Sequence, residues 1–344
     1  MEFSNLLIQW YLQNKRDLPW RKTTDAYAIW LSEIMLQQTR VAQGMPYFFS
    51  FVNTFPTVFD LAQADEEQVL KLWQGLGYYS RARNMHKTAQ IVASEFNGQF
   101  PDNYNDLLRL KGIGQYTAAA IASFAFDEKV PVVDGNVFRV LSRYFDIETD
   151  ISSSGAKKEF AALAYALMPD EHPGLFNQAI MEFGALQCVP KNPNCDVCIF
   201  NSSCLALQKK KVNQLPVKPK KTKVRNRYFN YLVFVDDANT TLITKRTEKG
   251  IWHNLYEFPV IETETPEAPE SIIEQIHTKY SDMQITDVAA YRETVLHKLS
   301  HQHLAITFYE VRVAKKIKDG VALDAIKAFP FPIVIFNFIE KYCS

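Results

Sequence analysis

The sequence predicts a multidomain protein with an all-α region over residues 1–207 and a smaller α+β domain over residues 228–344. Apolar residues recur at helical spacing through the first region, separated by short segments rich in Pro, Gly, Asn and Asp. Strand-like runs begin only in the second region. The length of 344 residues gives each region room for a core of its own.

The first helix is expected at the N-terminus, where Phe3, Leu7 and Tyr11 lie on one helical face. Further helical stretches follow, bounded by turn-forming residues, over Trp30–Phe51, Glu66–Trp73, Ser80–Phe96, Tyr116–Phe126 and Gly135–Phe145. A succession of helices with short connections predicts an all-α core.

A basic stretch separates the two regions. Residues 208–227 carry nine basic and no acidic side chains and show no amphipathic period, so they are expected to form a linker. The sequence leaves open whether these charges are solvated or contact phosphates. The net charge of the chain is zero and its pI is near 7.0, so any contact with nucleic acid must come from local patches and backbone amides.

The second region is expected to begin with a β-hairpin, in which Tyr231–Val235 and Thr241–Lys245 flank a turn at Asp236–Asn239. A helical face is expected over Ala268–Tyr280 and a further strand over Leu304–Val313. This mixture predicts a small α+β domain.

Neither a signal peptide nor a membrane span is indicated. The N-terminal residues lack a basic flank followed by an apolar core. The longest apolar stretches, around Tyr116–Phe126 and Phe329–Phe338, are shorter than the roughly 18 to 20 residues that a membrane helix needs. We therefore expect a soluble cytoplasmic protein.

Four of the five cysteines lie within seventeen residues, as Cys188-x6-Cys195-x2-Cys198-x5-Cys204. In a reducing compartment this grouping is typical of a metal site rather than of disulfides. Four thiolates so close together can surround one tetrahedral ion or one iron–sulfur cubane. Zinc remains the alternative, although zinc sites usually combine two Cys-x2–4-Cys pairs and only one is present. Cys343 has no partner in sequence and is expected to be incidental.

The segment Leu107–Tyr116 has the pattern of a helix, a tight glycine turn and a second helix. Gly112 and Gly114 would let the backbone approach a phosphate closely, and the N-terminus of the following helix would offer it unpaired amides. This arrangement grips a phosphodiester without net positive charge, which suits the neutral pI. The alternative is an ordinary turn between two helices.

Two carboxylates are candidates for catalysis. Asp134 precedes the helical stretch Gly135–Phe145, and the simplest interpretation of it is an N-cap. Glu33 lies within the apolar stretch Trp30–Leu36, where loss of water would raise its pKa and suit it to general acid catalysis. The alternative for Glu33 is an exposed position on an amphipathic helix.

Five motifs together resemble the MutY-type adenine DNA glycosylases, which belong to the helix-hairpin-helix superfamily. They occur in the expected order and are Ser32–Val41, Gly75–Arg81, Gly112–Thr117, Val133–Val137 and the four cysteines. The resemblance implies a six-helix barrel over residues 22–130 and an iron–sulfur subdomain made of the N-terminal helix and residues 131–207. It also implies a Nudix-like domain over residues 228–344. One [4Fe–4S] cluster would be held by Cys188, Cys195, Cys198 and Cys204.

The resemblance also implies an activity, the removal of adenine mispaired with 8-oxoguanine or guanine from double-stranded DNA. Glu33 would protonate adenine at N7, and Asp134 would stabilise the oxocarbenium-like sugar, by transient covalent capture, before water adds. Tyr116 and Asn136 would position these groups and the water. The adenine would leave the base stack to reach them. Gly112 and Gly114 would hold a phosphate near the lesion.

Other residues would read the duplex. By resemblance, Gln38 and Tyr78 would fill the gap that the adenine leaves and touch the opposite strand. The Nudix-like domain would read 8-oxoguanine through the loop Leu299, Ser300 and His301, in which Leu299 replaces the phenylalanine of the family. Residues 250–280 lack the dense run of Arg and Glu that a Nudix hydrolase needs, so a recognition domain without hydrolase activity is expected. The protein would act as a monomer, at the nucleoid if the source is bacterial.

Two alternatives remain at this point. One is a bifunctional pyrimidine glycosylase and lyase of the endonuclease III type, which shares the hairpin, the aspartate and the cysteines. Such enzymes carry a nucleophilic lysine where this chain has Tyr116, and a tyrosine cannot form a Schiff base. They also lack a further domain after the cysteines. The other alternative is a non-catalytic protein that binds damaged DNA, against which the pair of Glu33 and Asp134 argues.

Overall fold

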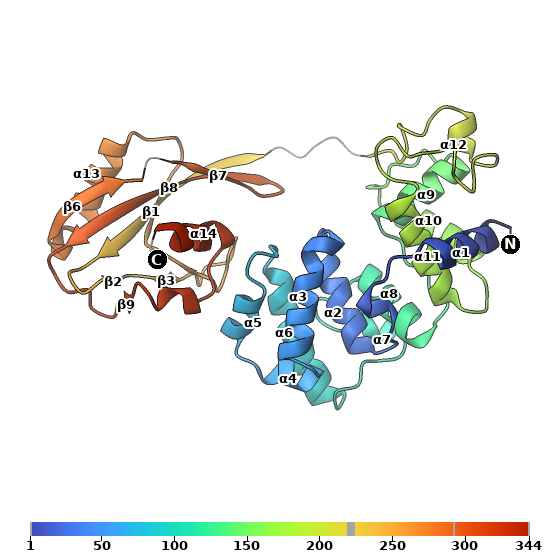
Figure 1. Ribbon diagram of the computed structural model, residues 1–344, viewed down its shortest axis with the longest axis horizontal. Coiled ribbons are helices and arrows are strands. Elements are labelled where there is room, and N and C mark those ends of the chain that lie inside the picture. The colour runs from blue at the N-terminus through green and yellow to red at the C-terminus, as the bar shows by residue number, and fades with distance from the viewer. Residues whose placement is uncertain (1, 219–223, 292, 343–344) are drawn as a thin grey trace. The chain divides into compact units, whose positions relative to one another are not determined.

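The computed structural model of the chain describes residues 2–218, 224–291 and 293–342 (Figure 1). It divides into two compact units. The helical unit comprises Met1–Gln63 and Asn84–Lys220, and the α+β unit comprises Ala64–Arg83 and Lys221–Ser344. Among the described residues, no helix is long and apolar enough to cross a membrane. Cys343 lies outside the described residues.

The helical unit is built from short helices joined by turns, as the sequence predicts. Its helices are α1 (Glu2–Asn14), α2 (Ala26–Leu36), α3 (Val41–Thr54), α4 (Val58–Gln63), α6 (Ser80–Glu95, from Asn84 onward), α7 (Tyr104–Leu107), α8 (Gln115–Phe126), α9 (Gly135–Phe145), α10 (Ala156–Leu167), α11 (Pro173–Leu186) and α12 (Leu205–Gln208). The expectation of one helical stretch over Trp30–Phe51 is wrong, because the chain turns between α2 and α3 and forms two helices there. Gln38 adopts a left-handed backbone there, with φ +57°, which no helix continues.

The core of the helical unit joins the two ends of its sequence. Buried Phe3, Leu7 and Tyr11 on α1 pack with buried residues of α9, α10 and α11. The ring of Phe3 stacks on that of Phe200, with centroids 4.8 Å apart. Because Phe200 lies between Cys198 and Cys204, this contact ties the N-terminal helix to the cysteine loop.

The α+β unit is organised on a five-stranded sheet with the order β5-β1-β8-β6, in which β7 also pairs with β8. The central strands β1 and β8 run parallel, and the other pairings are antiparallel. Two smaller sheets join β2 to β9 and β3 to β4. The strands are β1 (Arg225–Val235), β2 (Thr240–Thr241), β3 (Thr244–Lys245), β4 (Tyr256–Glu257), β5 (Val260–Thr263), β6 (Ile285–Ala290), β7 (Val295–Lys298), β8 (Gln302–Val313) and β9 (Val321–Ala322).

Helices contribute to the packing on both faces of this sheet. Leu232 and Phe234 of β1 pack with Ile272 and Ile276 of α13 (Pro269–Lys279). On the other face, Phe338 of α14 (Ile333–Tyr342) stacks on Phe308 of β8, with centroids 3.8 Å apart. Because the second half of β1 is buried on both faces of the sheet, its apolar residues contribute to two cores. The remaining helix of this unit is α5 (Glu66–Leu72).

The predicted hairpin after Tyr231 is wrong in its pairing, although its turn is present. The amide of Asn239 donates to the carbonyl of Asp236 at 3.0 Å. However, β1 has β5 and β8 as its neighbours in the sheet, and β2 pairs with β9 instead of with β1. The Asp236 carboxylate also accepts from the amides of Ala238, Thr240 and Ile317, which directs the chain out of the sheet.

The basic stretch 208–227 begins in the helical unit and ends in the α+β unit. Lys209 and Lys211 form ion pairs with Asp146, which follows α9. Arg227 lies in β1 and forms two hydrogen bonds with the Glu262 carboxylate, at 2.6 and 2.7 Å. These basic groups are therefore neutralised within the protein. Residues 219–223 lie outside the described residues.

Candidate active site

Glu33 is a buried acid on α2, with 7% of its surface exposed. Helices α2 and α8 pack against each other, and the Tyr116 hydroxyl on α8 donates to Glu33 Oε2 at 2.6 Å. Burial raises the pKa of Glu33 to about 7, with the Tyr116 hydrogen bond lowering it in part and the charge of Asp134 raising it further. Glu33 can therefore hold a proton at neutral pH, and the predicted rise in its pKa is confirmed.

Asp134 is the N-cap of α9, as predicted. Its Oδ1 accepts from the amides of Asn136 and Val137, each at 2.8 Å, and its Oδ2 accepts from Asn136 Nδ2 at 2.7 Å. Burial raises the pKa of Asp134, while these hydrogen bonds and the charge of Arg139 lower it in part. The donors fix the carboxylate in one orientation, so capping and a chemical role are compatible here.

One cavity of about 530 Å³ brings the four predicted catalytic residues together. Its lining includes Glu33, Tyr116, Asp134 and Asn136. These residues come from α2, α8 and the start of α9, and all lie in the helical unit. A cavity of this size accommodates a nucleobase and its sugar.

The sequence analysis missed a charged cluster in the lining of this cavity, which Glu182 forms with Arg16 and Arg21. Glu182 on α11 is fully buried and accepts from Arg16 Nη2 at 2.6 Å and Arg21 Nη2 at 2.7 Å. Burial raises the pKa of Glu182, but the hydrogen bonds from the two arginines outweigh this effect and lower it to about 2. The sequence carries no local signal for this group, because Glu182 lies more than 160 residues from both arginines.

Arg139 connects the cavity to the cysteine loop. Its Nη2 donates to Asn136 Oδ1 at 2.8 Å and to the carbonyl of Gly184 at 2.6 Å, and its Nε donates to the carbonyl of Cys188 at 2.7 Å. Asn136 in turn binds Asp134. A chain of hydrogen bonds through Asn136 and Arg139 thus links Asp134 to the backbone of Cys188.

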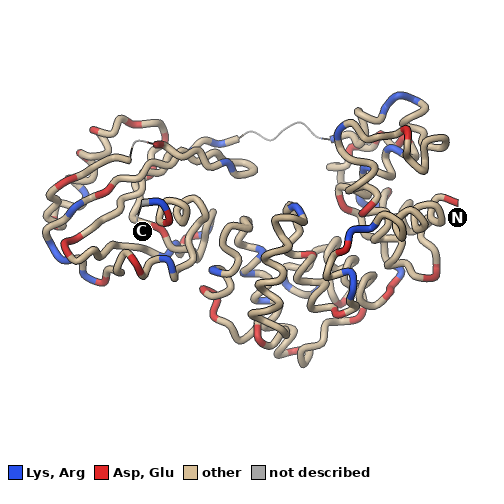
Figure 2. Tube along the Cα trace, viewed as in Figure 1, with Lys and Arg blue, Asp and Glu red and all other residues tan. Residues whose placement is uncertain are grey.

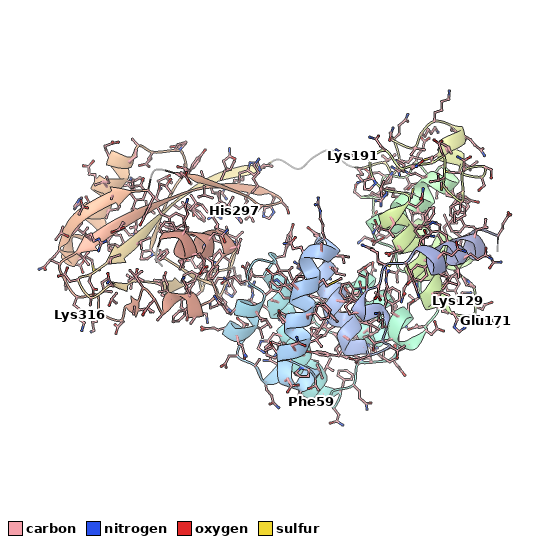
Figure 3. The ribbon with its side chains drawn as sticks, viewed as in Figure 1. Phe59, Lys129, Glu171, Lys191, His297 and Lys316 are labelled. Atoms are coloured by element: carbon pink, nitrogen blue, oxygen red, sulfur yellow. The ribbon has the colours of Figure 1, made fainter. Side chains whose placement is uncertain are left out.

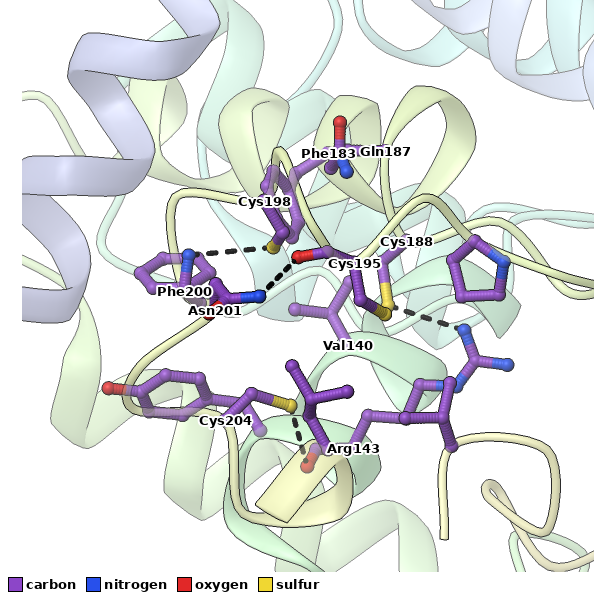
Figure 4. Close-up of a pocket in the computed structure, with 14 residues that line it drawn as sticks. Val140, Arg143, Phe183, Gln187, Cys188, Cys195, Cys198, Phe200, Asn201 and Cys204 are labelled. Atoms are coloured by element: carbon purple, nitrogen blue, oxygen red, sulfur yellow. Dashed lines mark hydrogen bonds between the residues drawn. The ribbon is translucent and has the colours of Figure 1, made fainter. Parts of the chain in front are cut away.

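The four cysteines that were predicted to bind a metal line one small pocket (Figure 4). Arg143 Nη1 approaches Cys188 Sγ at 3.4 Å, and the Phe200 amide donates to Cys198 Sγ at 3.4 Å. Among the described residues, no three His, Cys, Asp or Glu side chains are close enough to hold a single metal ion. Lys191 is exposed on the same loop (Figure 3).

The predicted glycine hairpin lies between α7 and α8. Gly112 has φ +81°, and a Cβ on it would lie 2.7 Å from Asn84 Cβ. Gly114 is the N-cap of α8, and a Cβ there would meet nothing within 4 Å. Basic and acidic side chains are interspersed along both units (Figure 2). The amides at the start of α8 are therefore a better candidate for phosphate contact than any uniformly basic face.

Two residues predicted to enter the duplex have a left-handed backbone. Gln38 has φ +57° in the turn after α2, and Tyr78 has φ +49° in the turn before α6. Such conformations are uncommon for residues other than glycine and cluster at functional sites. Gln38 belongs to the helical unit, whereas Tyr78 belongs to the α+β unit.

Tyr78 is in contact with the predicted recognition loop. Its hydroxyl and that of Ser300 share a hydrogen bond. Both residues line a pocket of about 550 Å³, together with Leu299 and His301. Leu299 is half-buried in the tight turn between β7 and β8, where its amide donates to the carbonyl of Gln302 at 2.7 Å. The lining of this pocket also includes Trp252 and His297. His297 is half-buried and is labelled in Figure 3.

Comparisons with known proteins agree with this architecture. The family model of the HhH-GPD superfamily of base excision DNA repair proteins matches residues 31–164, and a NUDIX domain model matches residues 230–341. A solved structure of a thermostable thymine-DNA glycosylase covers 60% of this chain and 95% of its own, with a TM-score of 0.56 and 29% sequence identity. The expected fold class is confirmed.

Two curated relatives extend the match beyond the helical unit. The adenine DNA glycosylase of Buchnera aphidicola subsp. Schizaphis graminum is 40% identical over 262 residues, which are 76% of this chain and 75% of the relative. The adenine DNA glycosylase of Buchnera aphidicola subsp. Baizongia pistaciae is 35% identical over 305 residues, which are 88% of this chain and 84% of the relative. The chain therefore belongs to the family of adenine DNA glycosylases.

Proposed function

We propose that this protein hydrolyses the N-glycosidic bond of adenine mispaired with 8-oxoguanine, or with guanine, and leaves an abasic site. The observation that carries the proposal is the pairing of two unlike carboxyl groups in one cavity. Glu33 has a pKa of about 7 and binds Tyr116, whereas Asp134 is held by three N–H donors. One group is suited to donate a proton and the other to face a developing positive charge.

In this mechanism, protonated Glu33 transfers its proton to N7 of the extruded adenine. The bond between the base and C1′ then breaks, and its electron pair leaves with the neutral base. The carboxylate of Asp134 stabilises the positive charge on the sugar by forming a transient bond to C1′. Water then adds to C1′ as the bond to Asp134 breaks, and its proton passes to the Glu33 carboxylate, which restores both groups. Asn136 holds Asp134 in place through its side-chain amide, and Tyr116 holds Glu33.

The charged group in the lining of the same cavity offers one donor for recognition of adenine. Glu182 remains ionised, and its two oxygens accept from Arg16 and Arg21, which it holds in place. Arg21 Nη1 is buried and has no hydrogen-bond partner among the described residues, so it is available to an acceptor nitrogen of the ring.

The cysteine site fits one [4Fe–4S] cluster. Cys188, Cys195, Cys198 and Cys204 supply four thiolates around one small space, and two of these sulfurs accept N–H donors. Zinc is the alternative, but zinc sites usually combine two Cys-x2–4-Cys pairs, and these four cysteines contain one such pair. When bound, the cluster would supply a covalent cross-link of the loop that carries Lys191. A brown protein with about four irons per chain would support this assignment, whereas colourless protein with one zinc would contradict it.

Double-stranded DNA is the proposed partner. The amides that follow Gly112 and Gly114 would contact a phosphate, and Gln38 and Tyr78 would enter the gap that the adenine leaves. Ser300 and His301, with Leu299 beside them, would read the oxidised base. We infer a division into a catalytic region 1–207, a basic connection 208–227 and a recognition domain 228–344. The protein would act as a monomer on the DNA of the cytoplasm, because a single chain carries all of these residues.

One assay tests this proposal. Duplexes containing adenine opposite 8-oxoguanine, adenine opposite guanine, or thymine glycol are incubated with the protein and analysed with and without alkali. Strand cleavage at adenine that depends on alkali is expected, because the product is an abasic site. Cleavage at thymine glycol without alkali would instead indicate a pyrimidine glycosylase and lyase. Binding without cleavage of any strand would indicate a damage-binding protein.

A further inference from the structure

Residues 64–83 belong to the α+β unit, although they lie far from the rest of it in sequence. They comprise α5 (Glu66–Leu72) and the turn that carries Tyr78. The family model of the helical region spans this segment as well. A piece of the glycosylase sequence is thus held by the NUDIX domain, and the contacts that hold it lie on both sides of Tyr78.

The anchor before Tyr78 is polar and centred on Glu67. The Glu67 carboxylate accepts from Lys245 Nζ at 2.8 Å and from the Tyr256 hydroxyl at 2.9 Å. The hydrogen bond from Lys245 lowers the pKa of Glu67. Tyr256 packs edge-on against Phe329, with centroids 4.8 Å apart. Two short strands, β3 and β4, therefore present both partners of one carboxylate.

A second set of contacts continues along the segment. Lys71 Nζ lies 4.3 Å from the centre of the Phe336 ring and donates to the carbonyl of Phe329 at 3.3 Å. The amide of Phe331 donates to Gln74 Oε1 at 3.0 Å. After Tyr78, Arg83 Nη1 donates to the carbonyl of His253 at 2.7 Å.

Between these two sets of contacts the chain makes a turn that places Tyr78 in the lining of the pocket. Gly75 and Gly77 have φ +98° and +76°, and Tyr78 itself has φ +49°. Trp73 Nε1 donates to the carbonyl of Gly77 at 3.0 Å. The hydroxyl of Tyr78 reaches that of Ser300 across the pocket that both residues line. The pocket thus depends on a segment that is fixed at both of its ends.

We propose that Glu67 is a positioning residue for recognition of the base opposite adenine. It lies on the polar anchor rather than in the pocket, so it would act through Tyr78. Its ion pair with Lys245 holds α5 on the NUDIX domain, and Tyr78 is thereby kept beside Ser300. The inference rests on the proposed function, because it concerns the discrimination between 8-oxoguanine and guanine.

The exposure of the pair decides which substitution is informative. The side chains of Lys245 and Glu67 are 35% and 41% exposed, and loss of such a pair changes an equilibrium by at most about fivefold. Glu67→Gln is therefore a weak test. Glu67→Lys places two ammonium groups together and removes the acceptor of Tyr256, so it should reduce the ratio of the adenine release rates opposite 8-oxoguanine and guanine about tenfold.

The test is a charge exchange in the full-length protein with its metal site intact. Single-turnover rates of adenine release are measured on both duplexes for Glu67→Lys, Lys245→Glu and the double variant. Each single variant should release adenine opposite 8-oxoguanine more slowly than the wild type. The rate of release opposite guanine should stay unchanged, so the ratio of the two rates falls. The double variant should recover part of the ratio, because the ion pair is restored with its polarity reversed while the hydrogen bond from Tyr256 to residue 67 stays lost. Arg312→Glu is the matched control, since it breaks a pair with Glu310 at the far end of β8 from the loop.

The role of Glu67 would be overturned if both single variants kept the wild-type ratio of the two rates. It would also be overturned if the double variant recovered none of the lost ratio. If the wild-type protein itself releases no adenine or does not distinguish the duplexes, the proposed function fails instead. Thermal unfolding is recorded for every variant. Should a charge reversal not fold, Tyr256→Phe replaces it, because it keeps the ring against Phe329 and removes only the bond to Glu67. An unchanged ratio in Tyr256→Phe would then count against the proposal, and a reduction of about threefold would support it.

Discussion

The Tyr116 hydroxyl lies 2.6 Å from Glu33 Oε2 and donates a hydrogen bond to it, across the contact between α8 and α2. Glu33 is buried and Tyr116 is half-buried, and loss of water raises the pKa of each. The tyrosine therefore stays protonated and acts as a donor at every pH of interest, while the acid titrates near neutrality. This relationship underlies the first three predictions.

Glu33→Gln should abolish proton donation while keeping the shape of the side chain. We expect the rate of adenine release to fall by at least about a hundredfold, with binding of the duplex retained. Single-turnover kinetics and a binding titration measure the two effects. Release of adenine at the wild-type rate would rule out Glu33 as the acid.

The same variant should become relatively more stable as the pH rises. The pKa of Glu33 is about 7 in the folded protein against an ordinary value of 4.5, so ionisation opposes folding above pH 4.5. The wild type loses up to about 3 kcal/mol of stability from this group between pH 4.5 and pH 7, whereas Glu33→Gln does not. Urea unfolding of both proteins at pH 5 and pH 8 gives the difference. An equal change in both would mean that Glu33 titrates normally.

Tyr116→Phe should shift the pH dependence of the reaction. The tyrosine hydrogen bond favours the charged form of Glu33 and lowers its pKa, so its loss should move the alkaline limb of the profile to higher pH. The maximum rate should also fall, because Glu33 is less firmly oriented. The profile is measured under single-turnover conditions. Tyr165→Phe, on an exposed residue of α10, is the control and should leave the profile in place.

Glu182→Gln should destabilise the fold, because it leaves Arg16 and Arg21 without their shared counterion. The pKa of Glu182 is about 2 when folded against an ordinary 4.5, so its contribution is present above pH 4.5 and is lost as the pH falls through 2. We expect a loss of about 2 kcal/mol at pH 7 and little difference from the wild type near pH 2. Urea unfolding measures it. Glu148→Gln removes an exposed partner of Lys211 and should cost less than about 1 kcal/mol.

Gly112→Ala should weaken the hairpin. Its backbone is left-handed, and the added Cβ would lie 2.7 Å from Asn84 Cβ, so we expect a loss of about 1 to 3 kcal/mol in stability together with weaker binding of duplex DNA. Gly114→Ala is the matched control for folding, because Gly114 has an extended backbone and open space around it. Equal stability of the two variants would contradict the strain at Gly112. Thermal unfolding and fluorescence anisotropy provide the two measurements.

Features of local origin were predictable from the sequence. The N-cap at Asp134 follows from one aspartate before an apolar helical face, and the structure confirms it. The glycine turn at Gly112 and the grouping of four cysteines are equally short in range. Caps, turns and closely spaced ligands depend on neighbours within a few residues, which a sequence states directly.

The sequence by itself determined the order of the helices, the change to an α+β domain and the two candidate carboxyls. Only the tertiary structure decided that β1 pairs with β5 and β8 rather than with the next strand, that Glu182 joins Arg16 and Arg21, and that α5 is held by Lys245 and Tyr256. These contacts join residues far apart in the chain, and their energies depend on burial and on partners that packing selects. No local pattern of residue types encodes this burial or this choice of partners.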